Sequence, residues 1–83
     1  MEIFYTLEAQ KQLKAVTNAD PKSARIIFEH ISRLPKLYLQ DPFLKGSRFS
    51  GLRRNRSGMY RMIYRVLEAE KRIHILTIAH RRH

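Results

Sequence analysis

The sequence predicts a single α+β domain, residues 1–83, in which two helices pack on one face of an antiparallel sheet. A chain of 83 residues has the length of one domain. Its first half contains apolar residues at the spacing of amphipathic helices. Its second half contains the alternation of apolar and polar residues that is typical of strands. The predicted order of elements is therefore strand, helix, helix, strand, strand, strand.

The first predicted strand and helix follow directly from the N-terminus. The run from Glu2 to Tyr5 is short, apolar and aromatic, which predicts a strand. Thr6 is a suitable N-cap for a first helix that extends to about Val16. The apolar side chains that this helix should bury are those of Ala9, Leu13 and Val16.

The second predicted helix has the clearest period in the chain. Asp20 can cap it, and Pro21 fits the first helical position, where a missing N–H costs nothing. We expect it to end at about Leu34, because Pro35 cannot continue a helix. A short turn joins the two helices, so they should form an antiparallel hairpin. The apolar stripe of the second helix consists of Ala24, Ile27, Phe28, Ile31 and Leu34.

Three further strands are predicted, over residues 47–55, 59–67 and 72–79. The middle strand is the most clearly predicted. Every second residue from Tyr60 to Val66 is apolar or aromatic, and two of the positions between them are arginines. Turns at Ser57-Gly58 and at residues 68–71 are short, which predicts an antiparallel meander. The side chains expected to face the helices are Tyr60, Met62, Tyr64 and Val66, with Arg61, Ile63, Arg65 and Leu67 on the open face.

The net charge of +10 indicates an anionic partner. Nucleic acid, an acidic membrane surface and an acidic protein all fit, and so does a solvated basic surface with no specific partner. The charge is concentrated in the second half, where Arg81 and Arg82 lie near the C-terminus. Between Pro42 and Leu67 there are seven basic residues and no acidic ones: Lys45, Arg48, Arg53, Arg54, Arg56, Arg61 and Arg65.

Several classes of protein are excluded by what the sequence lacks. It has no cysteine, so it has neither a disulfide framework nor a thiolate nucleophile. No apolar run reaches the roughly 20 residues of a membrane span, and the first residues do not resemble a signal peptide, so we expect a cytoplasmic protein. No zinc-type cluster, P-loop or dinucleotide-binding turn is present, so we expect no metal and no cofactor. A domain this small cannot form a deep cleft, so chemistry is expected on an open face.

The predicted central hairpin contains a motif, L-x-R-x-R-x-G-x-Y-R-x-x-Y, that runs from Leu52 to Tyr64. The chain also ends in a His-Arg-Arg group at residues 80–82. Together with the element order, these features resemble toxins of the RelE/ParE superfamily. The resemblance implies a RelE-like fold and one half of a type II toxin–antitoxin module, with a cognate acidic antitoxin as partner. It also implies one of two targets: the RelE branch cleaves mRNA in the ribosomal A site without metal, and the ParE branch poisons DNA gyrase.

The resemblance implies the catalytic residues by position. Arg54 and Arg56 before the turn, Arg61 after it and Arg81 of the last strand would form the active surface. The chain departs from the family pattern in two ways. Vigorously cleaving members often have lysines at the positions of Arg54 and Arg56, and they commonly have a tyrosine a few residues beyond the His-Arg-Arg group, where this sequence reaches only His83.

Metal-free RNA cleavage requires a base, a cation that stabilises the charged phosphorane, and an acid. Arginine suits the second role, because its planar fork binds two phosphate oxygens. It serves poorly as acid or base, since its pKa exceeds about 12. His80 is therefore a candidate proton carrier, although the simpler interpretation is a polar strand-end residue that hydrogen-bonds to backbone. The basic residues expected to contact RNA phosphates without taking part in chemistry are Lys45, Arg48, Arg53, Arg65 and Arg82.

Three functions are consistent with this pattern. The leading hypothesis is a ribosome-dependent mRNA endoribonuclease that inhibits translation, because the four candidate catalytic arginines should converge on one face. The second is an inhibitor of DNA gyrase. The third is a catalytically weak relic that only binds its antitoxin or RNA, which the missing lysines and tyrosine favour.

Overall fold

A computed structural model describes residues 1–46 and 51–82 and confirms the α+β class. The four strands are β1 (Glu2–Tyr5), β2 (Leu52–Ser57), β3 (Tyr60–Leu67) and β4 (Arg72–His80). Their order in the sheet is β1-β4-β3-β2. The last three strands form the predicted antiparallel meander, whereas β1 pairs with β4 in parallel, so the sheet is mixed. The helices are α1 (Leu7–Ala19) and α2 (Pro21–Leu37), followed by a 3₁₀ turn, η1 (Tyr38–Gln40).

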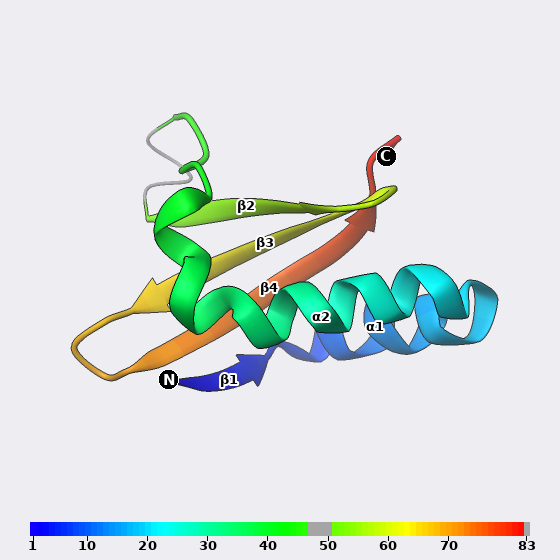
Figure 1. Cartoon of the computed structure of the whole chain (residues 1–83), viewed down its shortest axis with the longest axis horizontal. Helices are drawn as coiled ribbons and strands as arrows, with labels where there is room; N and C mark the ends of the chain where they lie inside the picture. The colour runs from blue at the N-terminus through cyan, green and yellow to red at the C-terminus, as the bar shows by residue number, and fades with distance from the viewer. Residues whose placement is uncertain (47–50, 83) are drawn as a thin grey trace.

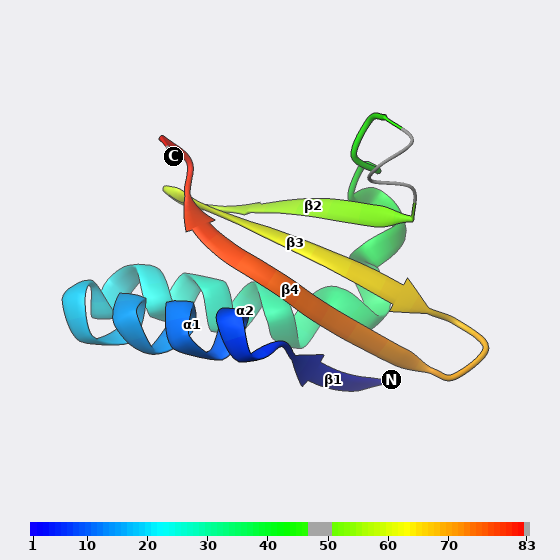
Figure 2. The ribbon, with the colours of Figure 1, turned by 180° about the vertical axis from the view of Figure 1, so that it is seen from behind.

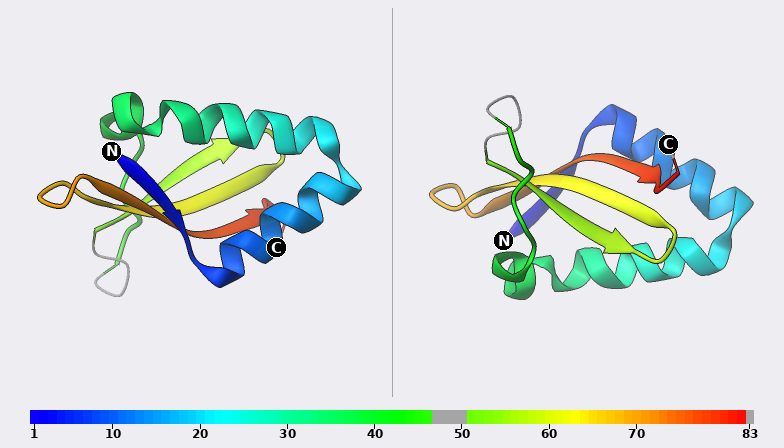
Figure 3. Two further views of the ribbon diagram at one scale, coloured as in Figure 1. Left: turned by 90° about the horizontal axis from the view of Figure 1, so that it is seen from below. Right: turned by 90° about the horizontal axis from the view of Figure 1, so that it is seen from above.

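The two helices run side by side across one face of the sheet and leave the other face uncovered (Figures 1 and 2). The hairpin that they form is visible in both panels of Figure 3. None of the helices in the described part of the chain is long and apolar enough to span a membrane.

Both predicted helix caps are confirmed. The Thr6 side chain accepts a hydrogen bond from the Ala9 N–H, and the Asp20 side chain accepts one from Ser23. The end predicted for α2 is wrong, because the helix passes through Pro35 and continues to Leu37. A proline in the last turn removes only one helical N–H. The buried side chain of Leu34 holds this turn against the sheet, and its carbonyl still accepts from Tyr38.

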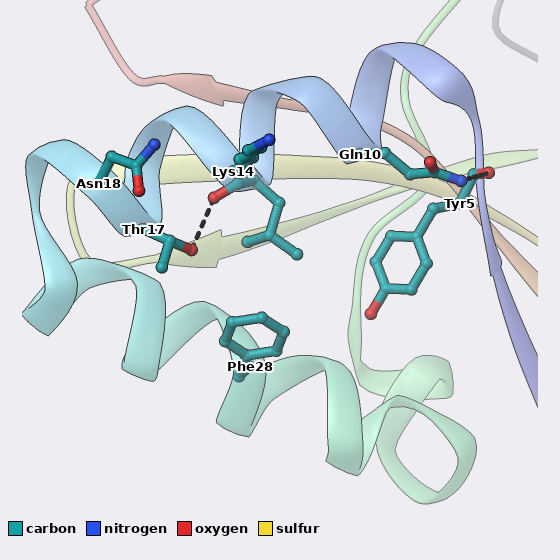
Figure 4. Close-up of a pocket in the computed structure, with 7 residues that line it drawn as sticks. Tyr5, Gln10, Lys14, Thr17, Asn18 and Phe28 are labelled. Atoms are coloured by element: carbon teal, nitrogen blue, oxygen red, sulfur yellow. Dashed lines mark hydrogen bonds between the residues drawn. The ribbon is translucent and has the colours of Figure 1, made fainter.

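The predicted buried faces of the helices are largely confirmed, with one exception. Phe28 was expected in the apolar stripe of α2, but its side chain is 48% exposed. It lies one position beyond Ile27, a rotation of about 100° around the helix. Figure 4 shows its ring facing α1, with Thr17 above it and Tyr5 to one side, at an apolar groove of about 370 Å³ between the helices. The core itself consists of Ala9, Leu13, Val16, Ala24, Ile27, Ile31, Leu34, Met62, Tyr64, Ile73, Ile75 and Ile78.

The strand predicted over residues 47–55 is shifted toward the C-terminus. β2 begins at Leu52 and ends at Ser57, and residues 47–50 lie outside the described part of the chain. The outer edge of β2 is closed by the segment that precedes it. The Leu44 N–H donates to the Leu52 carbonyl at 2.8 Å, and the Arg54 N–H donates to the Pro42 carbonyl at 3.0 Å. This pairing covers an edge that would otherwise be open to other strands.

A β-bulge in β4 decides which of its side chains reach the open face. Ile63 of β3 pairs with Thr77 and Tyr64 pairs with Ile75, so Leu76 is the extra residue. The backbone around it is bonded by the N-cap residue of α1 and by a residue in the middle of that helix. The Thr6 hydroxyl donates to the Leu76 carbonyl at 2.8 Å, and the Ile78 N–H donates to Gln12 Oε1 at 2.6 Å. Because the bulge reverses the alternation, the side chains of β4 on the open face are Arg72, His74, Thr77 and Ala79.

Candidate nucleic-acid interface

The β2–β3 hairpin places three predicted catalytic arginines on the open face. Arg54 and Arg56 alternate along β2 with residues that face the helices. Arg56 lies directly opposite Arg61 in the antiparallel register, and Arg54 lies opposite Ile63. Like charges in opposite positions destabilise a sheet, by up to about 1 kcal/mol. The repulsion between these two guanidinium groups therefore makes an anionic ligand favourable at this point.

Two shallow depressions adjoin these arginines. The first, of about 340 Å³, lies over the middle of the open face, and Arg61 and Lys45 provide its cationic groups. The rest of its lining is Leu44, Ile63, Thr77 and Ala79. The second, of about 280 Å³, lies at the edge of the sheet and is lined by Asp41, Pro42, Arg54, Asn55 and Arg56. The hairpin therefore offers cations on both sides of the Arg56–Arg61 pair.

A polar network beneath β2 holds this strand in place. The Tyr64 hydroxyl donates to Asp41 Oδ2 at 2.5 Å, and the Asn55 amide donates to the same carboxylate at 3.0 and 3.2 Å. Burial and the bond to Asp41 raise the pKa of Tyr64 far above its ordinary value, so this hydroxyl remains protonated. The network therefore ties together β2, β3 and the segment after η1.

The network continues to α2 through His30. Because the Asn55 amide nitrogen donates to Asp41, its Oδ1 must accept, and His30 Nδ1 lies 2.9 Å from it. His30 Nδ1 must therefore bear the hydrogen. Ser57, which is fully buried, donates to the same Asn55 Oδ1 at 2.9 Å. Asn55 and Ser57 thus anchor the helix-facing side of the strand whose other side presents Arg54 and Arg56.

Arg53 was predicted to contact phosphate, but its contacts in the structure are with the protein. Its guanidinium lies over the ring of Phe43 at 3.9 Å and over that of Tyr38 at 5.4 Å. It also donates to the Asp41 carbonyl at 2.9 Å. These contacts fasten the segment after η1 to β2 on the side that faces the helices.

The residues at the C-terminal end of β4 are divided between the two faces. Arg81 is exposed beside the hairpin turn, where it donates to the Gly58 carbonyl at 3.2 Å. His80 pairs in register with Tyr60, which packs against the core, and their rings meet edge to face at 5.3 Å. Arg82 is exposed, and its N–H donates to His80 Nδ1 at 3.2 Å. His80 therefore lies on the helix-facing side of the sheet, away from Arg61.

The remaining predicted RNA contacts are at the edges of the site. Lys45 is exposed at the first depression, and Arg65 is exposed on the open face opposite Leu52 and His74. Arg48 lies outside the described residues. Within residues 1–46 and 51–82, no group of three or more His, Cys, Asp or Glu side chains is arranged to hold a metal ion.

Sequence reasoning missed Asp41, Asn55 and His30 as supports of the site. The bonds that join these three residues to one another link positions far apart in the chain: 25 residues separate His30 from Asn55, and 14 separate Asp41 from Asn55. One signal was present: Asn55 is a polar residue at a strand position that alternation assigns to the buried side.

A comparison with known protein families shows the family to which this chain belongs. The family model described as the ParE toxin of the type II toxin–antitoxin system parDE matches residues 3–83. The chain belongs to this toxin family. The predicted membership of the RelE/ParE superfamily is thereby confirmed. No curated protein sequence matches the toxin.

Solved toxin structures share its fold. The YoeB/ParE toxin from Agrobacterium tumefaciens has a TM-score of 0.85 at 19% identity, over 96% of this chain and 98% of that one. The toxin–antitoxin complex RelBE2 from Mycobacterium tuberculosis gives 0.82 at 23% identity, over 96% of both chains. The archaeal RelE–RelB complex from Pyrococcus horikoshii gives 0.72 at 25% identity, over 96% and 93%. These neighbours bear ParE and RelE names alike, so the fold is common to both branches.

Proposed function

We propose that this toxin acts on RNA, as a ribosome-dependent endoribonuclease that cleaves mRNA in the A site and stops translation. The observation that supports the proposal is that Arg54, Arg56 and Arg61 lie together on the sheet face opposite the helices. Cations held together against their own repulsion indicate a polyanionic ligand. The open face is also shallow, so the ribosome would supply the opposite wall of the site.

In the proposed reaction, the ribose 2′-OH attacks the adjacent phosphate and the 5′-oxygen leaves. Arg61 and Arg56 would bind the non-bridging oxygens as negative charge develops on them. Charge stabilisation of this kind is often the largest catalytic contribution. Arg54 and Lys45 would hold the flanking phosphates, and Arg81 would close the site from the hairpin turn.

The two proton transfers need groups other than arginine. Neither a histidine nor a tyrosine is among the described residues that line the depression at Arg61. His80 would have to reach round the end of β4 from its contact with Tyr60. We therefore assign proton transfer to water and to groups of the ribosome, with arginines of the toxin stabilising the charge.

An antitoxin is the second proposed partner. The structures of M. tuberculosis RelBE2 and P. horikoshii RelE–RelB are complexes of a toxin with its antitoxin. A net charge of +10 would attract an acidic, partly disordered segment that folds on the open face. Such a segment would cover Arg56 and Arg61 and so exclude RNA.

Inhibition of DNA gyrase is the alternative function. The observation that favours it is the match to a family model named for ParE. The arginine face argues against it, because the centre of a protein–protein interface tends to be depleted of charge. A toxin that only binds RNA or antitoxin is a further alternative, since His80 faces away from Arg61.

One experiment separates these functions. The toxin is induced briefly in bacteria, and mRNA 5′ ends and the DNA-damage response are measured in the same culture. The proposal predicts new 5′ ends in translated regions before any damage response. Intact transcripts with a rapid damage response would establish gyrase as the target.

A variant pair tests the role of Arg61. Arg61→Ala should lower cleavage of ribosome-bound mRNA by about 10²–10³-fold, because it removes charge stabilisation at the phosphate. Arg25→Ala, on the exposed side of α2, is the matched control and should cleave like the unmodified toxin. Equal cleavage by all three proteins would contradict the proposed site.

A further inference from the structure

We propose that the open face has a second RNA contact, a platform of Phe4, His74 and Arg72 on which one unpaired base stacks. This inference rests on the proposed action on RNA. It assigns a position for a nucleotide that is distinct from the phosphate at Arg61. It concerns β1 and the N-terminal half of β4, which none of the predicted site residues occupies.

The platform consists of an exposed aromatic ring, an arginine guanidinium that lies over this ring, and an imidazole in contact with it. The Phe4 side chain is 40% exposed, although Ile3 and Tyr5 on either side pack against the core. The Arg72 guanidinium lies over the Phe4 ring, 5.0 Å from its centroid. The His74 ring contacts Phe4 from the other strand, with 5.6 Å between centroids and an angle of 55° between the planes.

The platform lies on the same face as the arginine hairpin. Phe4 pairs in register with His74, and His74 pairs with Arg65 of β3. Arg65 and Arg61 are four residues apart on one side of β3, about 13 Å at the rise of a strand. A single strand of RNA that crosses the sheet from Arg61 would therefore pass Arg65 on its way to Phe4.

One feature favours a base over other ligands. Unpaired bases stack on aromatic side chains and on arginine guanidinium planes. The exposed Phe4 ring with the Arg72 guanidinium over it offers both kinds of surface at one place. Glu2 pairs in register with Arg72, so its carboxylate would repel a phosphate that approached Arg72. Arg65 is therefore the better contact for the phosphate of this nucleotide.

Fluorescence can test this stacking directly. The chain contains no tryptophan, so Phe4→Trp places a single reporter in the platform. Phe28→Trp is the matched control, because Phe28 is similarly exposed but lies on the helices. Both proteins are titrated with an unstructured RNA decamer and with the same decamer made abasic at every second position. The RNA is end-labelled, so binding itself is followed by anisotropy.

The expected result is strong quenching of Phe4→Trp by the RNA, weaker quenching by the abasic RNA, and none in the control. Phe4→Leu, which keeps an apolar side chain but cannot stack, should bind the RNA about 10-fold more weakly than the unmodified toxin. Circular dichroism establishes that each variant is folded.

Three outcomes would overturn the platform. The first is tight RNA binding without quenching, which leaves the arginine site and the proposed function intact. The second is full affinity in Phe4→Leu. The third is equal quenching by a polyglutamate peptide, which would make this surface a site for an acidic protein. If the unmodified toxin binds no RNA at all, this inference falls, and the cleavage assay on ribosome-bound mRNA decides the proposed function separately.

Discussion

Arg56 and Arg61 illustrate how a single pair of side chains can serve a ligand at the expense of the fold. They lie opposite each other on neighbouring strands with no acidic residue between them in the register. Each could be replaced by an uncharged strand-forming residue without loss of core contacts, because both project from the open face. Their presence is therefore explained by binding and not by stability.

Arg56→Thr should separate the two effects. Loss of one guanidinium relieves a like-charge pair worth about 0.2–1 kcal/mol and introduces a residue suited to strands. We expect unfolding by urea to show equal or greater stability, while affinity for single-stranded RNA falls. A clear loss of stability would mean that Arg56 supports the hairpin.

Tyr64→Phe tests the buried hydroxyl beneath the site. It removes the bond to Asp41 and should cost about 1–3 kcal/mol near neutral pH. The pKa of Tyr64 is raised by folding, so its contribution is fully present below the unfolded value of about 10 and is lost as pH rises further. The loss of stability between pH 9 and about 11 should be less steep in the variant. Identical slopes in the two proteins would contradict this assignment.

At the scale of elements, β2 is the strand that joins the site to the rest of the molecule. It is held at its edge by residues 42–44, beneath by the Asp41–Asn55–His30 network, and at its end by the buried Ser57. Its outer side then presents Arg54 and Arg56 to solvent. A rigid inner side is what keeps the spacing of these arginines constant.

Asn55→Asp should weaken the attachment of β2 without changing the size of the side chain. It removes the amide donor and places a second carboxylate beside Asp41, which should cost about 2–4 kcal/mol of unfolding free energy. The penalty should shrink toward pH 4, where one carboxylate takes up a proton. The only other asparagine is Asn18, which is exposed, so Asn18→Asp is a control that should change stability by less than about 0.5 kcal/mol. Equal stabilities of the two variants would show that the network does not support β2.

At the scale of the whole molecule, the charge is arranged on one side of a two-layer fold. The helices cover one face of the sheet, and the face with the arginines lies on the side away from them (Figures 1 and 2). A shallow basic surface suits a partner that encloses the bound RNA from the opposite side, as the ribosome would. The long-range field also increases the rate of encounter with any polyanion.

The salt dependence of RNA binding measures how much of this charge is used. With about four phosphate contacts to a single strand, the logarithm of the affinity should fall with the logarithm of salt concentration at a slope near −3. Fluorescence anisotropy of a labelled oligonucleotide across a series of salt concentrations gives this slope. A slope near zero would mean that the arginines do not contact phosphates.

Much of the fold could be predicted from the sequence, because the signals for it are local. Thr6 and Asp20 begin their helices, Gly58 forms the hairpin turn, and the alternation in β3 identifies its buried side. Each of these depends on residues within a few positions of one another. The same alternation, together with the short turn, predicts that the arginines of the hairpin share one face of the sheet.

The tertiary structure alone decided the features that depend on contacts between distant residues. The bulge at Leu76 exists because Thr6 and Gln12 bond the backbone around it, and it moves His80 to the helix-facing side. The Arg53 side chain lies on the helix-facing side because its guanidinium packs on the rings of Phe43 and Tyr38. The sequence by itself therefore determined the family, the element order and the basic hairpin, since periodicity and motif are local properties. Which polar side chains support that hairpin and which face the ligand was decided by packing, which joins residues far apart in the chain.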